Sequence, residues 1–172
     1  MKNNNAEIGE MTDRAVFITP QELLEHWQGH RRVTRKVIEA FPEDKLFTYS
    51  IGGMRPFAQL VIEMLVMEAP GIRGVAEGKW GNYETIGASF SKARTRADLL
   101  RLWDEATVQI NELWPRISPQ QFHEKYKAFD TYDGYNYSHI LYFIDNEIHH
   151  RAQGYVYLRS LGMEPPHFAI RD

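Results

Sequence analysis

The chain has 172 residues, of which 43% are hydrophobic and 13% aromatic, enough apolar material for one compact domain with a sizeable core. The formal net charge is −3, the sequence pI is about 6.2, and the 20 basic residues are spread along the chain. This distribution argues against nucleic acid and anionic membranes as partners. The sequence contains no cysteine, which excludes disulfides, thiolate metal ligands and a cysteine nucleophile.

The N-terminal residues are polar and lack the apolar run of a signal peptide. We expect an irregular arm over residues 1–18, followed by a single domain over residues 19–172. No apolar stretch approaches the roughly 20 residues that a membrane-spanning helix needs. The sequence therefore predicts a cytoplasmic protein without a membrane partner.

Cap signals and helical periodicity predict the first two of four long helices. The first is expected over residues 20–40, because Thr19 and Glu22 form a capping-box pattern at its start. The second is expected over residues 55–70, where a nearly continuous apolar run meets Pro70, a residue that usually ends a helix.

The same signals predict a third helix over residues 95–114 and a fourth over residues 137–161, with Gly162 as its C-terminal cap. Residues 71–92 are rich in glycine and aromatic residues, and we interpret them as a long loop. The aromatic residues of 118–136 could line a site or cover the core, and the pattern does not decide between these roles. No segment shows convincing strand alternation. The simplest architecture is an all-α four-helix bundle with long connections.

One helix face carries polar side chains of the kind that bind metals. Asn146 and His150 lie four residues apart, which places them one turn apart on one face, as two ligands of a single metal ion require. Phe143 and Tyr157 share that face, so it is also the apolar face. Glu63 lies inside the apolar run of the second predicted helix, and a buried carboxylate needs a partner. If the two helices face each other, the three polar side chains form a metal site.

Two other arrangements remain open at this point. Glu63 could accept hydrogen bonds from Asn146 and His150 in a buried network that holds no metal. Asp145 and His149 form a second pair at the same spacing, on a face rotated by about 100° and nearer to solvent.

The first predicted helix also carries a row of ligand-type side chains. Glu22, His26 and His30 follow one another at four-residue steps, and we expect them to form a solvated face with intrahelical pairs. The other histidines have no partner that the sequence specifies and are expected at the surface or its boundary: His123, His139 and His167.

Several segments resemble the DinB/YfiT-like superfamily. The most specific is Glu-Ile-His-His-Arg-Ala-Gln at 147–153, followed by residues 157–166, which is similar to a last helix of the common form H-x-x-x-H-[RI]-[GA]-Q. His-Arg-Arg-Val-Thr-Arg at 30–35 and Gly-Met-Arg-Pro-Phe-Ala-Gln-Leu at 53–60 agree with it, and the resemblance covers roughly residues 22–166. It implies a four-helix bundle, often dimeric, with a divalent metal held by one histidine of the second helix and two of the last.

The chain departs from that triad at two of its three positions. Glu63 and Asn146 stand where the resemblance implies histidines, and His150 is the one ligand that is retained. Both replacements are capable oxygen ligands, so the three residues could still form an open face that water or substrate completes. Losing two imidazoles shifts the preference toward harder ions such as manganese or iron, while zinc and nickel remain possible.

The resemblance implies a metal-dependent enzyme that acts on a small molecule as a thiol transferase or a hydrolase. A low-molecular-weight thiol is a candidate co-substrate, and a homodimer is expected. Tyr157 and Gln153 are candidates for supporting the ligands, and no residue is assigned a catalytic role. The alternative is a non-catalytic bundle, a ligand-binding or stress-related dimer, whose altered triad no longer holds a metal.

Overall fold

The computed structural model describes residues 17–90 and 92–172, so the predicted arm over residues 1–18 falls almost entirely outside the described part. The elements follow one another in this order: α1 (Pro20–Ala40), α2 (Glu43–Leu46), α3 (Phe57–Glu77), α4 (Tyr83–Phe90), α5 (Arg96–Leu113), η1 (Trp114–Arg116), α6 (Pro119–Phe122), β1 (Lys125–Ala128), β2 (Tyr132–Tyr135) and α7 (Asn136–Ser160).

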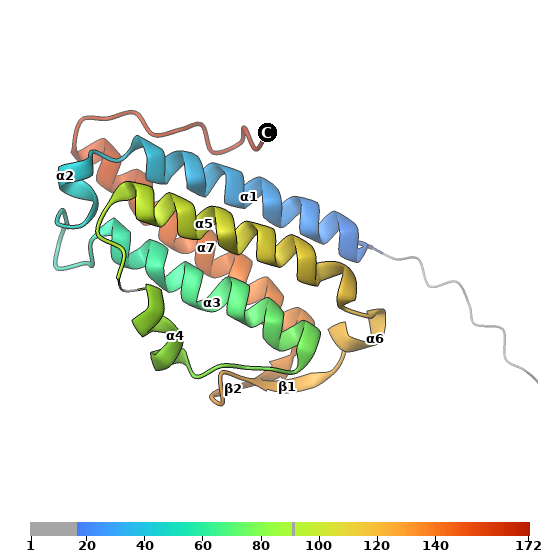
Figure 1. The fold of residues 1–172 in the computed structure, drawn as a ribbon. Helices are drawn as coiled ribbons and strands as arrows, with labels where there is room; N and C mark the ends of the chain where they lie inside the picture. Colours follow the sequence, from blue (N-terminus) through green and yellow to red (C-terminus); the bar gives the residue numbers. More distant parts are fainter. Residues whose placement is uncertain (1–16, 91) are drawn as a thin grey trace, which may run out of the picture.

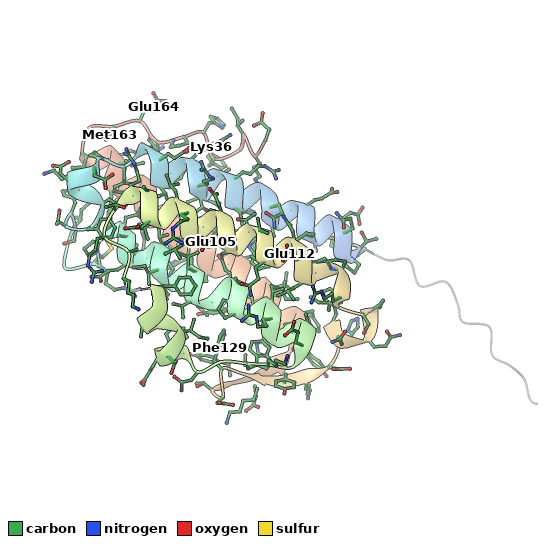
Figure 2. The ribbon with its side chains drawn as sticks, in the orientation of Figure 1. Lys36, Glu105, Glu112, Phe129, Met163 and Glu164 are labelled. Carbon is green, nitrogen blue, oxygen red and sulfur yellow. The ribbon has the colours of Figure 1, made fainter. Side chains whose placement is uncertain are left out.

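Four long helices, α1, α3, α5 and α7, lie alongside one another (Figure 1). α3 packs against α5 and α7, and α1 packs against the same two helices. The apolar faces therefore meet in one shared core, in which Trp27, Phe57 and Trp103 are almost fully buried. Figure 2 shows Glu105 and Glu112 projecting outward from α5. This arrangement confirms the predicted all-α fold class.

The caps of α1 and α7 form as the sequence predicts. The Thr19 side chain accepts from the backbone N–H of Glu22, whose carboxylate accepts from the backbone N–H of Thr19 in return. This reciprocal pair satisfies two N–H groups that helical bonding leaves free. At the end of α7, Gly162 adopts a φ of 76°, and the next N–H, of Met163, bonds back to Leu158.

The predicted end of α3 near residue 70 is wrong, because the helix continues through Pro70 to Glu77. A proline inside a helix removes one backbone hydrogen bond and crowds the preceding turn. Helix packing overrides that cost here, since the residues on both sides of Pro70 are buried against neighbouring elements. The helix ends at Gly78, which has a φ of 68°.

Two glycines after Pro70 allow close packing against α3. A Cβ at Gly71 would lie 2.4 Å from the ring of Phe143, and one at Gly74 would lie 2.3 Å from the indole of Trp80. Both rings therefore rest directly on the helix backbone. Gly71 and Gly74, which contributed to the prediction of a loop, thus let aromatic side chains approach the backbone of α3.

The segments on either side of α5 also differ from the prediction. Residues 71–92 contain the end of α3 and the short helix α4, so the long loop expected there is wrong. Within 118–136, β1 and β2 form an antiparallel hairpin whose turn includes Phe129, with a φ of 52°. Each strand has four residues, mostly exposed, so no apolar alternation marks it in the sequence.

None of the helices in residues 17–90 and 92–172 combines the length and apolarity needed to cross a membrane.

Candidate functional site

The predicted ligands of the second and last long helices face each other across the α3–α7 contact. Glu63 lies in the second turn of α3, and Asn146 and His150 lie in the middle of α7. Asn146 and His150 are 7% and 5% exposed, whereas the Glu63 side chain retains 21% exposure. Glu63 Oε1 lies 3.1 Å from His150 Nε2. The structure thus brings Glu63 and His150 into contact, and Asn146 lies one helical turn before His150 on α7.

Glu63 is bound on both oxygens. His150 Nε2 donates to Oε1, and the guanidinium of Arg55 forms an ion pair with Oε2 at 2.5 Å. The hydrogen bond from His150 and then that from Arg55 lower the pKa of Glu63 to about 2, despite the opposing effect of burial. Glu63 is therefore a carboxylate across the physiological pH range. The sequence pattern places Arg55 at the start of the second predicted helix and does not select it as a site residue, and in the structure it lies just before α3.

Two buried atoms on this face of α7, Asn146 Oδ1 and His150 Nδ1, have no hydrogen-bond partner among residues 17–90 and 92–172. Buried polar atoms are rarely left unpaired, since the lost hydration costs about 1–3 kcal/mol each. An amide oxygen without a donor, one helical turn from the His150 imidazole that contacts Glu63, is a candidate cation ligand.

The donor set is compatible with a divalent ion. Two ligands at roughly 2.1 Å from one ion and at right angles to each other are separated by about 3.0 Å, close to the 3.1 Å between Glu63 Oε1 and His150 Nε2. Within residues 17–90 and 92–172, no three His, Asp or Glu side chains cluster as metal ligands do. The third ligand would therefore be the Asn146 amide oxygen.

A phenol side chain lies close enough to Glu63 to be affected by its charge. Tyr83, at the start of α4, is 39% exposed, and burial, followed by the charge of Glu63, raises its pKa. The nearby Tyr132 of β2 and Tyr142 of α7 also raise the pKa of Tyr83, and both side chains are more than half exposed. The hydroxyl of Tyr83 is thus protonated at neutral pH.

The two residues predicted to support the ligands make different contacts. The hydroxyl of Tyr157, which is fully buried, donates to the backbone carbonyl of Arg55 at 2.9 Å. Gln153 Nε2 instead lies 2.9 Å from His149 Nε2, on the exposed side of α7. Tyr157 therefore fixes the backbone that carries Arg55, and Gln153 does not contact the candidate ligands in any hydrogen bond of the structure.

The alternative pair of Asp145 and His149 is exposed, as its rotation around the helix predicts.

The interpretation of the α1 row as a solvated face is wrong for His30, which is 4% exposed. Its ring faces α7, where Arg151 Nη2 donates to Nδ1 at 2.9 Å. Because a guanidinium can only donate, the ring proton sits on Nε2, which lies 3.2 Å from His26 Nε2. Burial, and then the charge of Arg151, lower the pKa of His30 to about 3.

A buried polar cluster between the four long helices was not predicted. Arg31 of α1 forms an ion pair with Glu68 of α3, and both side chains are at most 1% exposed. Arg31 Nη2 also donates to the carbonyl of Trp103 at 3.0 Å, and Nε donates to Thr107 Oγ1 at 2.9 Å. Burial raises the pKa of Glu68, against the lowering effect of Arg31. Glu68 occupies the same apolar run as Glu63, so the argument used for Glu63 could have found it.

Glu147 of α7 completes this buried cluster. Its carboxylate accepts from Trp27 Nε1 at 3.0 Å and from Thr34 Oγ1 at 2.5 Å, and Arg151 Nη1 lies 3.5 Å away. Burial raises its pKa, and the charge of Arg31 opposes the shift. Sequence-based prediction selected Asn146 and His150 but not Glu147 and Arg151, which lie one position further along α7.

His139 differs from its predicted surface or boundary position. It is 8% exposed, its Nε2 donates to the carbonyl of Tyr126 at 3.1 Å, and its ring packs edge-on against Trp80. Phe129 also packs edge-on against Trp80, with ring centroids 5.3 Å apart. Phe129 of the hairpin turn therefore covers the core, whereas Tyr126, Tyr132 and Tyr135 are exposed.

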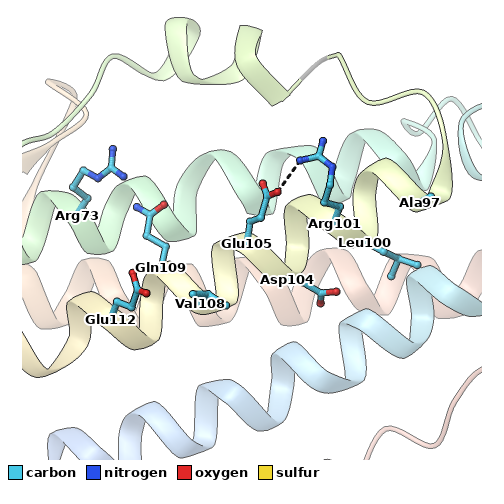
Figure 3. Close-up of a pocket in the computed structure, with 9 residues that line it drawn as sticks. All are labelled: Arg73, Ala97, Leu100, Arg101, Asp104, Glu105, Val108, Gln109 and Glu112. Atoms are coloured by element: carbon cyan, nitrogen blue, oxygen red, sulfur yellow. Dashed lines mark hydrogen bonds and ion pairs between the residues drawn. The ribbon is translucent and has the colours of Figure 1, made fainter.

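Two hollows lie away from the candidate ligands. One, of about 840 Å³, is an open depression on α5 with charged side chains around it (Figure 3). The other, of about 810 Å³, is an apolar groove between the start of α1, α6 and α7, lined by residues that include Leu23, Leu141 and Ile148. None of the three candidate ligands lines either hollow.

Comparisons with known proteins agree with this architecture. The model of the DinB family matches residues 1–172. Among solved structures, the chain is similar to a DinB-like protein from Bacillus subtilis, with 20% identity, a TM-score of 0.65 and coverage of 85% of this chain and 96% of that one. It is also similar to a DinB-like protein from Bacillus cereus ATCC 10987, with 16% identity, a TM-score of 0.66 and coverage of 86% and 95%. At these identities the two structures support the fold alone. No curated protein matches the chain.

Proposed function

Because the chain belongs to the DinB family, we propose that it is a metal-dependent enzyme that holds a divalent cation with Glu63, Asn146 and His150. The observation that carries this proposal is the 3.1 Å pair of Glu63 Oε1 and His150 Nε2, one helical turn from Asn146, whose buried Oδ1 has no partner in the described part of the chain. One carboxylate, one amide oxygen and one imidazole suit manganese or iron, and also accept zinc or nickel. These three ligands leave open positions for water or substrate.

The reaction we propose is a thiol transfer or a hydrolysis of a small molecule, with a low-molecular-weight thiol as a candidate co-substrate. A divalent cation supplies Lewis acidity, which polarises a substrate oxygen, stabilises a thiolate or lowers the pKa of a bound water. Glu63 remains ionised at neutral pH because its pKa is about 2. Tyr83 keeps its proton and can donate a hydrogen bond at the mouth of the site.

His150 must change its tautomer to act as a ligand. In the structure Nε2 donates to Glu63 Oε1, so the ring proton lies on Nε2 while Nδ1 has no partner. Coordination requires a lone pair on Nε2, and the proton must then reside on Nδ1. An Nδ1–H that is buried without an acceptor destabilises this form of the ring. Metal sites avoid that cost when the second ring nitrogen of the ligating histidine donates a hydrogen bond to an acceptor.

A second candidate function is a non-catalytic bundle that binds a ligand or acts as a stress-related dimer. One observation favours it: Arg55 and His150 together occupy both oxygens of Glu63, so the carboxylate is satisfied without a metal. Under either function we propose a homodimer and a cytoplasmic location.

Elemental analysis and thermal unfolding of the purified protein separate the two functions. We expect one manganese, iron, zinc or nickel ion per chain, and a melting temperature that rises with added ion. Glu63→Gln and His150→Ala should abolish both effects. Glu105→Gln, which removes an exposed carboxylate from an α5 ion pair, is the matched control and should abolish neither. Metal content that is far below one per chain and is unaffected by the first two variants would support the non-catalytic bundle.

A further inference from the structure

Arg55, whose guanidinium contacts Glu63, is held in place through its backbone. Arg55 lies two residues before α3, and its carbonyl accepts from the hydroxyl of Tyr157 at 2.9 Å. Tyr157 is fully buried in α7, so this bond connects the start of α3 to the last helix. The Arg55 side chain is 51% exposed. Its backbone is therefore fixed while its guanidinium can reorient at the mouth of the site.

Arg55 and a metal ion would compete for the same carboxylate. The guanidinium contacts Glu63 Oε2 at 2.5 Å, and His150 occupies Oε1. A divalent ion held by Glu63 and His150 would place two further positive charges beside the guanidinium, and like charges at this range repel strongly in a half-buried site. Glu63 therefore attracts Arg55 less when the ion is present.

We propose that Arg55 is a displaceable cation that neutralises Glu63 in the metal-free protein and, once the metal is bound, binds the oxyanion of the substrate. The inference rests on the proposed metal-dependent function and names its substrate class, a small molecule that carries a carboxylate or a phosphate. Arg55 is then a specificity-determining residue rather than a permanent structural partner of Glu63.

The surroundings of Arg55 fit an oxyanion. A guanidinium has five N–H donors in a planar fork that matches a carboxylate or a phosphate. Tyr83, whose pKa is raised by burial and by Glu63, adds a protonated hydroxyl. With a divalent ion bound, the charges of the ion and Arg55 exceed that of Glu63, so the mouth carries a net positive charge that attracts anions.

The proposal predicts that metal and oxyanion bind cooperatively. Metal binding releases Arg55, and an oxyanion that occupies Arg55 removes the competitor for Glu63. By linkage, each ligand must strengthen the binding of the other by the same factor. Removing the guanidinium should therefore tighten the binding of metal alone and abolish the cooperativity.

Calorimetric titration of Mn²⁺ into the metal-stripped protein tests this prediction. The titration is made without an oxyanion, with benzoate and with phenyl phosphate, for the wild type, Arg55→Gln, Arg55→Lys and Arg101→Gln. Arg101 is the matched control, because it forms an exposed ion pair with Glu105 at 2.8 Å (Figure 3) and lines the hollow on α5. Thermal unfolding of every variant confirms that it is folded.

We expect Arg55→Gln to bind Mn²⁺ on the order of 10-fold more tightly than the wild type, and an oxyanion to strengthen wild-type binding by about 5-fold or more. Arg55→Gln should lose the oxyanion effect, Arg55→Lys should keep only part of it, and Arg101→Gln should match the wild type. The anion that gives the larger effect identifies the group as carboxylate or phosphate.

Two results would overturn the inference in distinguishable ways. If Mn²⁺ binds with equal affinity to the wild type and Arg55→Gln, and neither anion changes that affinity, the role of Arg55 is wrong while the metal site stands. If no variant binds Mn²⁺, Zn²⁺ or Ni²⁺, the metal-dependent function and the role of Arg55 both fail.

Discussion

Replacing Glu147 with alanine tests whether the buried polar cluster stabilises the bundle. Glu147 has no exposed surface, and it accepts from Trp27 at 3.0 Å and from Thr34 at 2.5 Å. Its ion-pair partner Arg151 is 6% exposed. Removing one partner of a buried pair costs about 3–5 kcal/mol, and each donor left without an acceptor adds to that cost. We therefore expect Glu147→Ala to lower the free energy of unfolding by about 4 kcal/mol.

Urea denaturation followed by circular dichroism measures this change. A domain of this kind has a total stability of about 5–15 kcal/mol, so Glu147→Gln, which keeps one acceptor oxygen, gives a smaller loss that stays measurable. Glu105→Ala is the control, since it breaks an exposed pair with Arg101 and should cost less than about 1 kcal/mol. A loss for Glu147→Ala that is no larger than for Glu105→Ala would refute the view that the cluster is a coupled buried network.

Two further predictions concern pH and packing. The pKa of His30 is lowered to about 3 in the folded protein, whereas an unfolded histidine titrates near 6.5. Between these pH values only the unfolded chain binds the proton, so the stability contributed by His30 is fully present above pH 6.5 and is lost toward pH 3 by at most about 1.4 kcal/mol per pH unit. His30→Asn should remove this part of the slope in urea titrations at several pH values. Gly154→Ala would place a Cβ 2.4 Å from the ring of Phe57 and should cost about 1–3 kcal/mol. A Cβ at Gly87 would lie 4.0 Å from its nearest neighbour atom, so Gly87→Ala should be neutral or stabilising by up to about 1 kcal/mol. Equal melting temperatures for Gly154→Ala and Gly87→Ala would contradict the packing argument.

The sequence predicts those parts of the fold whose signals are local. The capping box at Thr19 and the glycine at position 162 correctly place the start of α1 and the end of α7. The continuation of α3 past Pro70 depends on tertiary packing instead. Pro70 is a local stop signal, but the rings of Phe143 and Trp80 pack on the glycines that follow it. Phe143 is distant in the sequence and Trp80 lies beyond the end of the helix, so helical periodicity could not reveal either contact.

The candidate site was predictable to the same extent. The i,i+4 spacing and the apolar neighbourhood of Glu63 identify which helix faces meet, and the 3.1 Å contact with His150 agrees with them. Arg55 was not predictable, because no periodic rule places a residue before the helix on a carboxylate two turns inside it. Its reach depends on the Tyr157 bond to its carbonyl, which only the folded structure reveals.

The rotation of α7 decides which chemistry each of its polar rows performs. Asn146 and His150 face α3, while Glu147 and Arg151, displaced by about 100° around the helix, face α1. Each row consists of two side chains four residues apart, so sequence spacing alone treats the rows as equivalent. The bonds from α1 to Glu147 and from Arg151 to His30 hold α7 at one rotation, and that rotation aims His150 at Glu63. The buried cluster thus positions the candidate ligands without contacting them, which is why a loss of Glu147 should weaken the binding of metal as well as the fold.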